Sequence, residues 1–204
     1  MIAAMILLIL GLVLFLGIHS VRIVADGLRS RFIAARGPMA WKGVYSLVAI
    51  AGFVLICVGF GQARHDTLVL WSPPRWTHDL AALLTLLAFI LIAAAYVPGN
   101  GIKARAKDPM ILGVKCWAAG HLLANGTLAD VVLFGSFLAW AVLDFRAVRQ
   151  RRRAGAEPAI GPARRGRSAI VVVVGVLAWM LFALHLHQPL IGVAPFPGFH
   201  GIGH

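Results

Sequence analysis

The stretch GVKCWAAGHLLANG, residues 113–126, is apolar enough to enter a bilayer, yet it contains Lys115, His121 and Asn125. Ionisable groups are costly in the hydrocarbon region, and they usually face a cavity or a partner inside a helix bundle. The helical period places His121 and Asn125 on one stripe and Lys115 on a different face. We therefore expect this helix to lie centrally in a bundle and to offer two polar faces.

The rest of the chain is similarly apolar. Of its 204 residues, 60% are hydrophobic and only 13% are charged, and the mean hydropathy is +0.87. A soluble domain of this size cannot bury so much apolar surface. The sequence predicts an all-α polytopic membrane protein, a single domain over 1–204 with six transmembrane helices, each near the length of about 20 residues that crosses a bilayer. The predicted helices are 3–24, 42–62, 78–97, 109–125, 128–147 and 168–188.

The basic residues alternate between the connections. They are frequent in 24–42, 97–109 and 146–167, sparse in 62–78, and absent beyond Arg167. Because cytoplasmic loops carry the excess of lysine and arginine, both termini are expected outside the cytoplasm. Segment 146–167 is then a flexible basic cytoplasmic loop, and 189–204 is an outer Gly/Pro tail. The net charge of +12 therefore indicates topology and anionic lipid, and not a nucleic-acid partner.

Polar groups inside the spans are the candidate functional residues. His19 and Arg22 share one helix face, and so do Asp108 and Lys115, although Arg22 also fits a solvated helix end. Lys115 lies about 10 Å along its helix from Asp108, so it either snorkels or pairs with a carboxylate. His121 either bonds a neighbouring helix or belongs to a site. No nucleophile–base pair or phosphate loop is visible, and imidazoles within an apolar bundle favour axial ligation of haem.

Several motifs are shared with one family of bacterial membrane proteins. They are LGIHSVRIVADGLRSR (16–31), PMAWKGVYSLV (38–48), VLWSPP (69–74), AAYVPGNGIK (94–103), the long stretch 107–135 and HQPLIGV (187–193). On these motifs the chain resembles the NnrU family over nearly its whole length, and the long stretch is the most specific. The resemblance implies a bacterial inner-membrane protein associated with denitrification and nitric oxide metabolism. It implies nitric oxide reductase or other denitrification proteins as partners, beside the lipid bilayer.

The same domain is similar to plant 15-cis-zeta-carotene isomerase, a haem b membrane enzyme that isomerises a double bond without net redox change. This similarity implies haem b held by His19 and His121. Our own hypothesis adds Asn125, Lys115 and Arg22 as residues that bind the cofactor beside them. The similarity also implies an isomerase-like or redox activity. The alternative function is a non-catalytic membrane factor that assembles or supplies nitric oxide reductase. Transport is a further alternative, although no inverted repeat is visible.

The expected topology offers rival partners for His121. His19 would lie near the cytoplasmic end of its helix and His121 towards the outer side, so they differ in depth by roughly 10–15 Å. Both axial nitrogens must lie about 2 Å from one iron. His187 and His78, at the outer ends of their helices, match the depth of His121 better. The resemblance thus implies His19 as the second ligand, whereas the expected depth favours His187 or His78.

Overall fold

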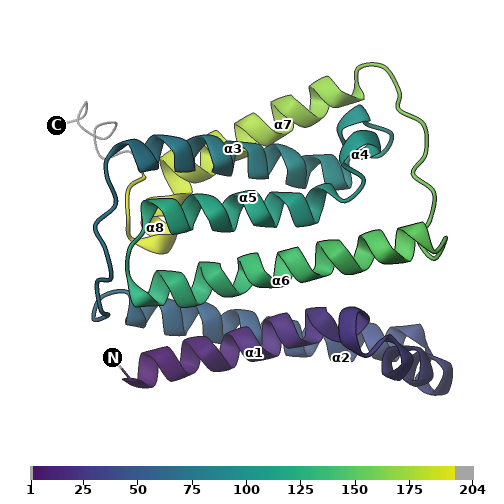
Figure 1. Ribbon diagram of the computed structural model, residues 1–204, viewed down its shortest axis with the longest axis horizontal. Coiled ribbons are helices and arrows are strands. Elements are labelled where there is room, and N and C mark those ends of the chain that lie inside the picture. The colour runs from purple at the N-terminus through teal and green to yellow at the C-terminus, as the bar shows by residue number, and fades with distance from the viewer. Residues whose placement is uncertain (1, 196–204) are drawn as a thin grey trace. The chain divides into compact units, whose positions relative to one another are not determined.

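The computed structural model describes residues 2–195, and this part of the chain is almost entirely helical (Figure 1). The prediction of an all-α protein is confirmed. The elements are α1 (Ile2–Val24), α2 (Asp26–Ala63), α3 (Trp76–Tyr96), α4 (Gly101–Ala106), α5 (Pro109–Ala124), α6 (Leu128–Arg153), α7 (Arg167–Leu181), the π-helical turn η1 (Phe182–Leu186) and α8 (His187–Ile191).

The helices have the lengths and surfaces of membrane spans. α1, α2, α3, α6 and the continuous run Arg167–Ile191 are long and apolar enough to cross a bilayer. The remaining predicted span, 109–125, corresponds to α5, which is shorter, with 16 residues and a length of about 24 Å. Large apolar side chains point outward, among them Val13, Leu47 and Leu83, which are 63%, 71% and 64% exposed. Such exposure suits lipid and not water, so the chain is a multi-pass membrane protein.

The chain forms two compact units. One contains the chain up to Ser72 together with Asn125–Arg149, and the other contains Pro73–Ala124 and the chain from Gln150 onward. The first unit therefore holds α1, α2 and most of α6. The second holds α3, α4, α5, α7, η1 and α8.

Glycines bring α1 and α2 together in the first unit. A Cβ atom on Gly11 would lie 2.6 Å from the Ile56 nitrogen, and a Cβ on Gly59 would overlap the Leu8 backbone. Small residues allow this backbone approach between transmembrane helices, where packing replaces the hydrophobic driving force. α6 meets the pair through larger side chains. The Phe60 and Phe134 ring centroids lie 5.9 Å apart, and further ring contacts join α6 to α1.

The turn at Asn125-Gly126 is tied to the segment before α3 that belongs to the same unit. The Gly126 carbonyl accepts hydrogen bonds from the backbone N–H groups of Leu70 and Trp71, at 2.8 and 3.2 Å. A Cβ atom on Gly126 would overlap the Trp71 carbonyl oxygen, so the position requires glycine. The break expected between the predicted helices 109–125 and 128–147 is present, and its backbone contact with Leu70 and Trp71 was not predicted.

In the second unit, α3 packs against both α5 and α7, as Figure 1 shows. A Cβ atom on Gly175 of α7 would lie 2.6 Å from the Ile90 Cα atom of α3. On the side of α5, a Cβ on Gly113 would lie 3.1 Å from the Ala88 carbonyl oxygen. The opening stretch of the sequence therefore presents its small residues to α3.

Several helix boundaries differ from the prediction. α2 begins at Asp26 and not at 42, and it is kinked at Gly37, whose φ is 82°. α4 was not predicted, and α6 continues to Arg153 instead of ending at 147. The last predicted helix, 168–188, is interrupted by η1 and reaches Ile191. These parts are charged, short or irregular, whereas the prediction relied on long apolar runs.

Candidate functional site

His19 lies half-buried in a cage of aromatic side chains within the first unit. Its ring centroid lies 4.3 Å from that of Phe15 on α1, 5.1 Å from Tyr45 on α2 and 6.0 Å from Trp140 on α6. The His19 Nδ1 atom lies 2.6 Å from the Phe15 carbonyl oxygen. Because a carbonyl only accepts, Nδ1 carries the proton and the lone pair is on Nε2. Metal-ligating histidines are commonly fixed in this way.

A groove of about 400 Å³ lies beside this cage, between α1 and α6. Apolar side chains line most of it, and Ser20, Ser136 and Trp140 add polar atoms. The Trp140 Nε1–H group is buried and has no hydrogen-bond partner among residues 2–195. A buried donor without an acceptor is unfavourable, so this N–H suits a ligand that carries an acceptor oxygen. A haem propionate is one group that carries such oxygens.

His121 has the same arrangement in the second unit. It is half-buried on α5, and its Nδ1–H group donates to the Trp117 carbonyl at 2.9 Å. The two rings lie 5.3 Å apart between centroids. The lone pair is again on Nε2, as in His19. Lys115 is also half-buried on α5, as expected for a polar group within a span.

The rival histidines differ from each other. His187 is half-buried, its Nδ1–H group donates to the Val193 carbonyl at 2.7 Å, and its ring meets Phe182 edge-on at 5.8 Å. The π-helical turn makes this contact, because the His187 backbone N–H donates to the Phe182 carbonyl five residues earlier. His78, at the start of α3, is exposed, and so is His185. Of the two rivals, His187 has the oriented imidazole.

The remaining predicted site residues are spread between the units. Arg22 is exposed in the last turn of α1. Asn125 is half-buried after α5 and belongs to the first unit, whereas His121 and Lys115 belong to the second. No group of three or more metal-ligating side chains gathers within the described residues. The structure thus brings His19 together with aromatic rings, and the pairing of His19 with His121 stays a prediction.

A comparison with family models supplies the next observation. The model described as NnrU protein matches residues 7–195. The chain belongs to the NnrU family. No curated protein matches the chain, and no solved structure matches it. The NnrU match covers both units and includes His19, His78, His121 and His187, so every candidate haem ligand lies within the family domain.

Two polar residues of this NnrU domain have partners that the sequence reasoning did not identify. The Asp108 carboxylate accepts from Arg152 Nη2 at 2.6 Å, whereas the sequence left open a pair between Lys115 and Asp108 or another carboxylate. The Asp108 and Arg152 side chains are only 12% and 22% exposed. Asp130, a buried polar group of α6, forms a capping box in which its carboxylate accepts from the Thr127 N–H and hydroxyl groups. The spacing Thr-x-x-Asp at the start of an apolar run was a readable signal for this cap.

The predicted tail and loop are only partly as expected. The tail 189–204 lies in part outside the described residues, and its described beginning contains the end of α8. The loop 146–167 begins as helix, and then Arg151 and Glu157 form an ion pair at 2.7 Å. The Arg164 N–H group donates to the Gly99 carbonyl at 2.8 Å. These contacts hold this loop to the end of α6 and to the segment that follows α3.

Proposed function

We propose that this NnrU-family protein binds haem b within the bacterial inner membrane and serves denitrification and nitric oxide metabolism. One observation carries the proposal. His19 and His121 each lie half-buried on an apolar helix and donate Nδ1–H to the carbonyl four residues earlier. An imidazole fixed in this tautomer directs a neutral Nε2 lone pair away from the helix backbone, which is what an axial ligand of haem requires.

The proposed ligand assignment follows from these residues. His121 would hold the haem iron, His19 would be the partner that the family resemblance implies, and His187 or His78 would be the rival on the outer side. The cations of Arg22 and Lys115 and the amide of Asn125 are suited to neutralise or bond the propionates. In this assignment, no more than two of these imidazoles would bind the same iron.

Bound haem would supply an iron centre for redox chemistry or for polarising a double bond in an isomerase-like reaction. The protein would contribute the fixed imidazoles, which hold the cofactor, and the aromatic rings around His19, which keep water away. The buried Trp140 N–H group would donate to an acceptor oxygen in the groove between α1 and α6. The alternative is the accessory factor for nitric oxide reductase, which needs no haem of its own.

Purification of the full chain from cells supplied with a haem precursor tests the proposal. The detergent-solubilised protein is expected to show a Soret band, and His121→Ala is expected to abolish it, because an axial ligand bonds the iron directly. Absorbance and the pyridine haemochrome assay measure the bound haem. The matched pair His187→Ala and His185→Ala examines the rival, since His187 is oriented and His185 is exposed in the same turn.

The outcomes separate the two functions. Loss of haem in His19→Ala with retention in His187→Ala identifies His19 as the partner, and the reverse identifies His187. A colourless wild-type protein, or a His121→Ala variant with its full complement of haem, would rule the proposal out. Copurification of that colourless protein with a reductase subunit would establish the accessory function.

The proposal also places both termini in the periplasm, because the basic connections alternate with the nearly neutral ones. A cysteine at Arg165→Cys, in a chain whose own cysteines are replaced, should react with an impermeant maleimide only after the membrane is opened. A cysteine at Gln188→Cys should react in cells whose outer membrane alone is permeabilised. Labelling of the first position from the periplasm would reverse the topology.

A further inference from the structure

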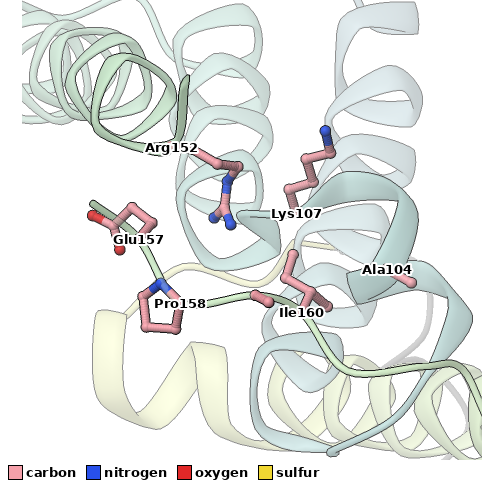
Figure 2. Close-up of a pocket in the computed structure, with 7 residues that line it drawn as sticks. Ala104, Lys107, Arg152, Glu157, Pro158 and Ile160 are labelled. Atoms are coloured by element: carbon pink, nitrogen blue, oxygen red, sulfur yellow. The ribbon is translucent and has the colours of Figure 1, made fainter. Parts of the chain in front are cut away.

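A cavity of about 410 Å³ lies in the second unit, and none of the histidines discussed above belongs to its lining. α4 and its end contribute Ala104 and Lys107, the end of α6 contributes Arg152, and the loop contributes 157–160 (Figure 2). The loop is held in place at this point. Besides the Arg151–Glu157 ion pair, the Ala156 N–H group donates to the Arg151 carbonyl at 2.9 Å. Contacts within the protein therefore fix the loop part of the cavity lining.

Arg152 lines this cavity, and one of its N–H groups is left unpaired by the described residues. Its Nη2 atom donates to Asp108, whereas its Nε atom is buried and has no hydrogen-bond partner within residues 2–195. Figure 2 shows the guanidinium group between the backbone at Lys107 and the loop segment that carries Glu157. Guanidinium groups bind planar or tetrahedral oxyanions through two N–H groups at once. An oxyanion in the cavity would bond the guanidinium group of Arg152, which belongs to the lining.

The charges around the cavity favour an anion. The two carboxylates are already paired, Asp108 with Arg152 and Glu157 with Arg151. Lys107 adds a further cation, and its backbone has a φ of 65°, which is unusual for a residue with a side chain. Its ammonium group extends away from the guanidinium in Figure 2, on a flexible stem that can turn. The lining and its paired partners thus carry more positive than negative charge.

We propose that this cavity binds a phosphate group, either as the free anion or as the headgroup of an anionic phospholipid. This goes beyond the haem proposal and does not depend on it. The lipid source fits the position of the cavity, because Arg152 follows the apolar part of the α6 span and Lys107 lies two residues before Pro109, where α5 begins. Basic residues at the ends of spans are where anionic headgroups are recognised. Arg152 would bond the phosphate oxygens and Lys107 would supply the second cation.

Binding to the full chain in detergent tests this site with two probes. Equilibrium dialysis measures inorganic phosphate, and native mass spectrometry measures retained phosphatidylglycerol, with phosphatidylcholine as the neutral comparison. Arg152→Gln should weaken binding about tenfold or more, because a charge-assisted bond is lost. Ile160→Trp should do the same by filling the cavity while leaving every charge in place. Arg165→Gln, which removes one exposed cation outside the lining, should change affinity less than about twofold.

Folding is checked separately, because Arg152→Gln leaves the Asp108 carboxylate without its cation. The double variant Asp108→Asn with Arg152→Gln removes that cost, and thermal unfolding and gel filtration report whether each variant is folded. Phosphate that is bound and competes with the lipid indicates the free anion as a ligand. Phosphatidylglycerol that binds without competition from phosphate indicates the lipid source. The site is disproved if neither probe binds the wild type, or if folded Ile160→Trp binds as the wild type does.

Discussion

Gly59→Leu is expected to lower the free energy of unfolding by about 3 kcal/mol. A Cβ atom at this position would overlap the backbone of Leu8, and no change of rotamer relieves a contact with backbone. α1 would have to move away from α2, which would also open the close contacts at Gly11 and Gly52. Denaturant or thermal unfolding of the detergent-solubilised protein measures the effect.

Gly61→Leu is the matched control for that variant. Gly61 lies two residues further along the same helix, and a Cβ atom there would meet nothing within 4 Å. Its replacement should change stability by less than about 0.5 kcal/mol, as for other substitutions on an open surface. Equal losses in both variants would mean that the contact between α1 and α2 does not determine the result.

Asn100→Ala is expected to be nearly as damaging, with a loss of about 3 kcal/mol. Asn100 is 1% exposed and joins two helices. Its amide group donates to the Ala94 and Val97 carbonyls at 2.9 and 2.5 Å, and its Oδ1 atom accepts from the Lys103 N–H group at 2.7 Å. Alanine removes all of these bonds and leaves the buried carbonyls at the end of α3 short of partners.

The comparison for Asn100 is Arg105→Met, which changes an exposed side chain of α4 and keeps the cap. Thermal unfolding of both variants should separate them clearly. Stability of Asn100→Ala equal to that of Arg105→Met would show that the cap contributes nothing. Because α4 leads into Lys107, Asn100 also positions one wall of the cavity described above.

The spans were predictable because a bilayer imposes a length and a composition on each of them. The bilayer does not impose this length and composition on the helical parts that the sequence did not predict. The first turns of α2 are rich in arginine, so a hydropathy search reads Asp26 onward as a loop although the chain there is helical. α4 is too short for periodicity to be seen. The asparagine at its N-cap, before Gly101, is a helix-start signal, which a search for apolar patterns does not detect.

In the candidate site too, some features were predictable from the sequence and others were not. Histidines within apolar runs are visible in a sequence, and His19, His121 and His187 were found in this way. Their tautomers depend on carbonyl oxygens whose positions follow only from the folded backbone. The partner of Asp108 is one arginine in the run RQRRR (149–153), and nothing local distinguishes Arg152 within that run. Long-range pairs of this kind need the structure.

The π-helical turn Phe182–Leu186 acts as one surplus residue in the last helix. An α-helix turns by about 100° per residue, so two residues five positions apart in a regular α-helix lie about 140° apart around the axis. The wider turn brings Phe182 and His187 onto one face, where their rings meet. Deleting one residue from the turn would restore ordinary bonding and leave the phenylalanine and the histidine four residues apart, still on one face. The ring contact is therefore expected to survive such a deletion, whereas inserting a second residue would separate the two rings.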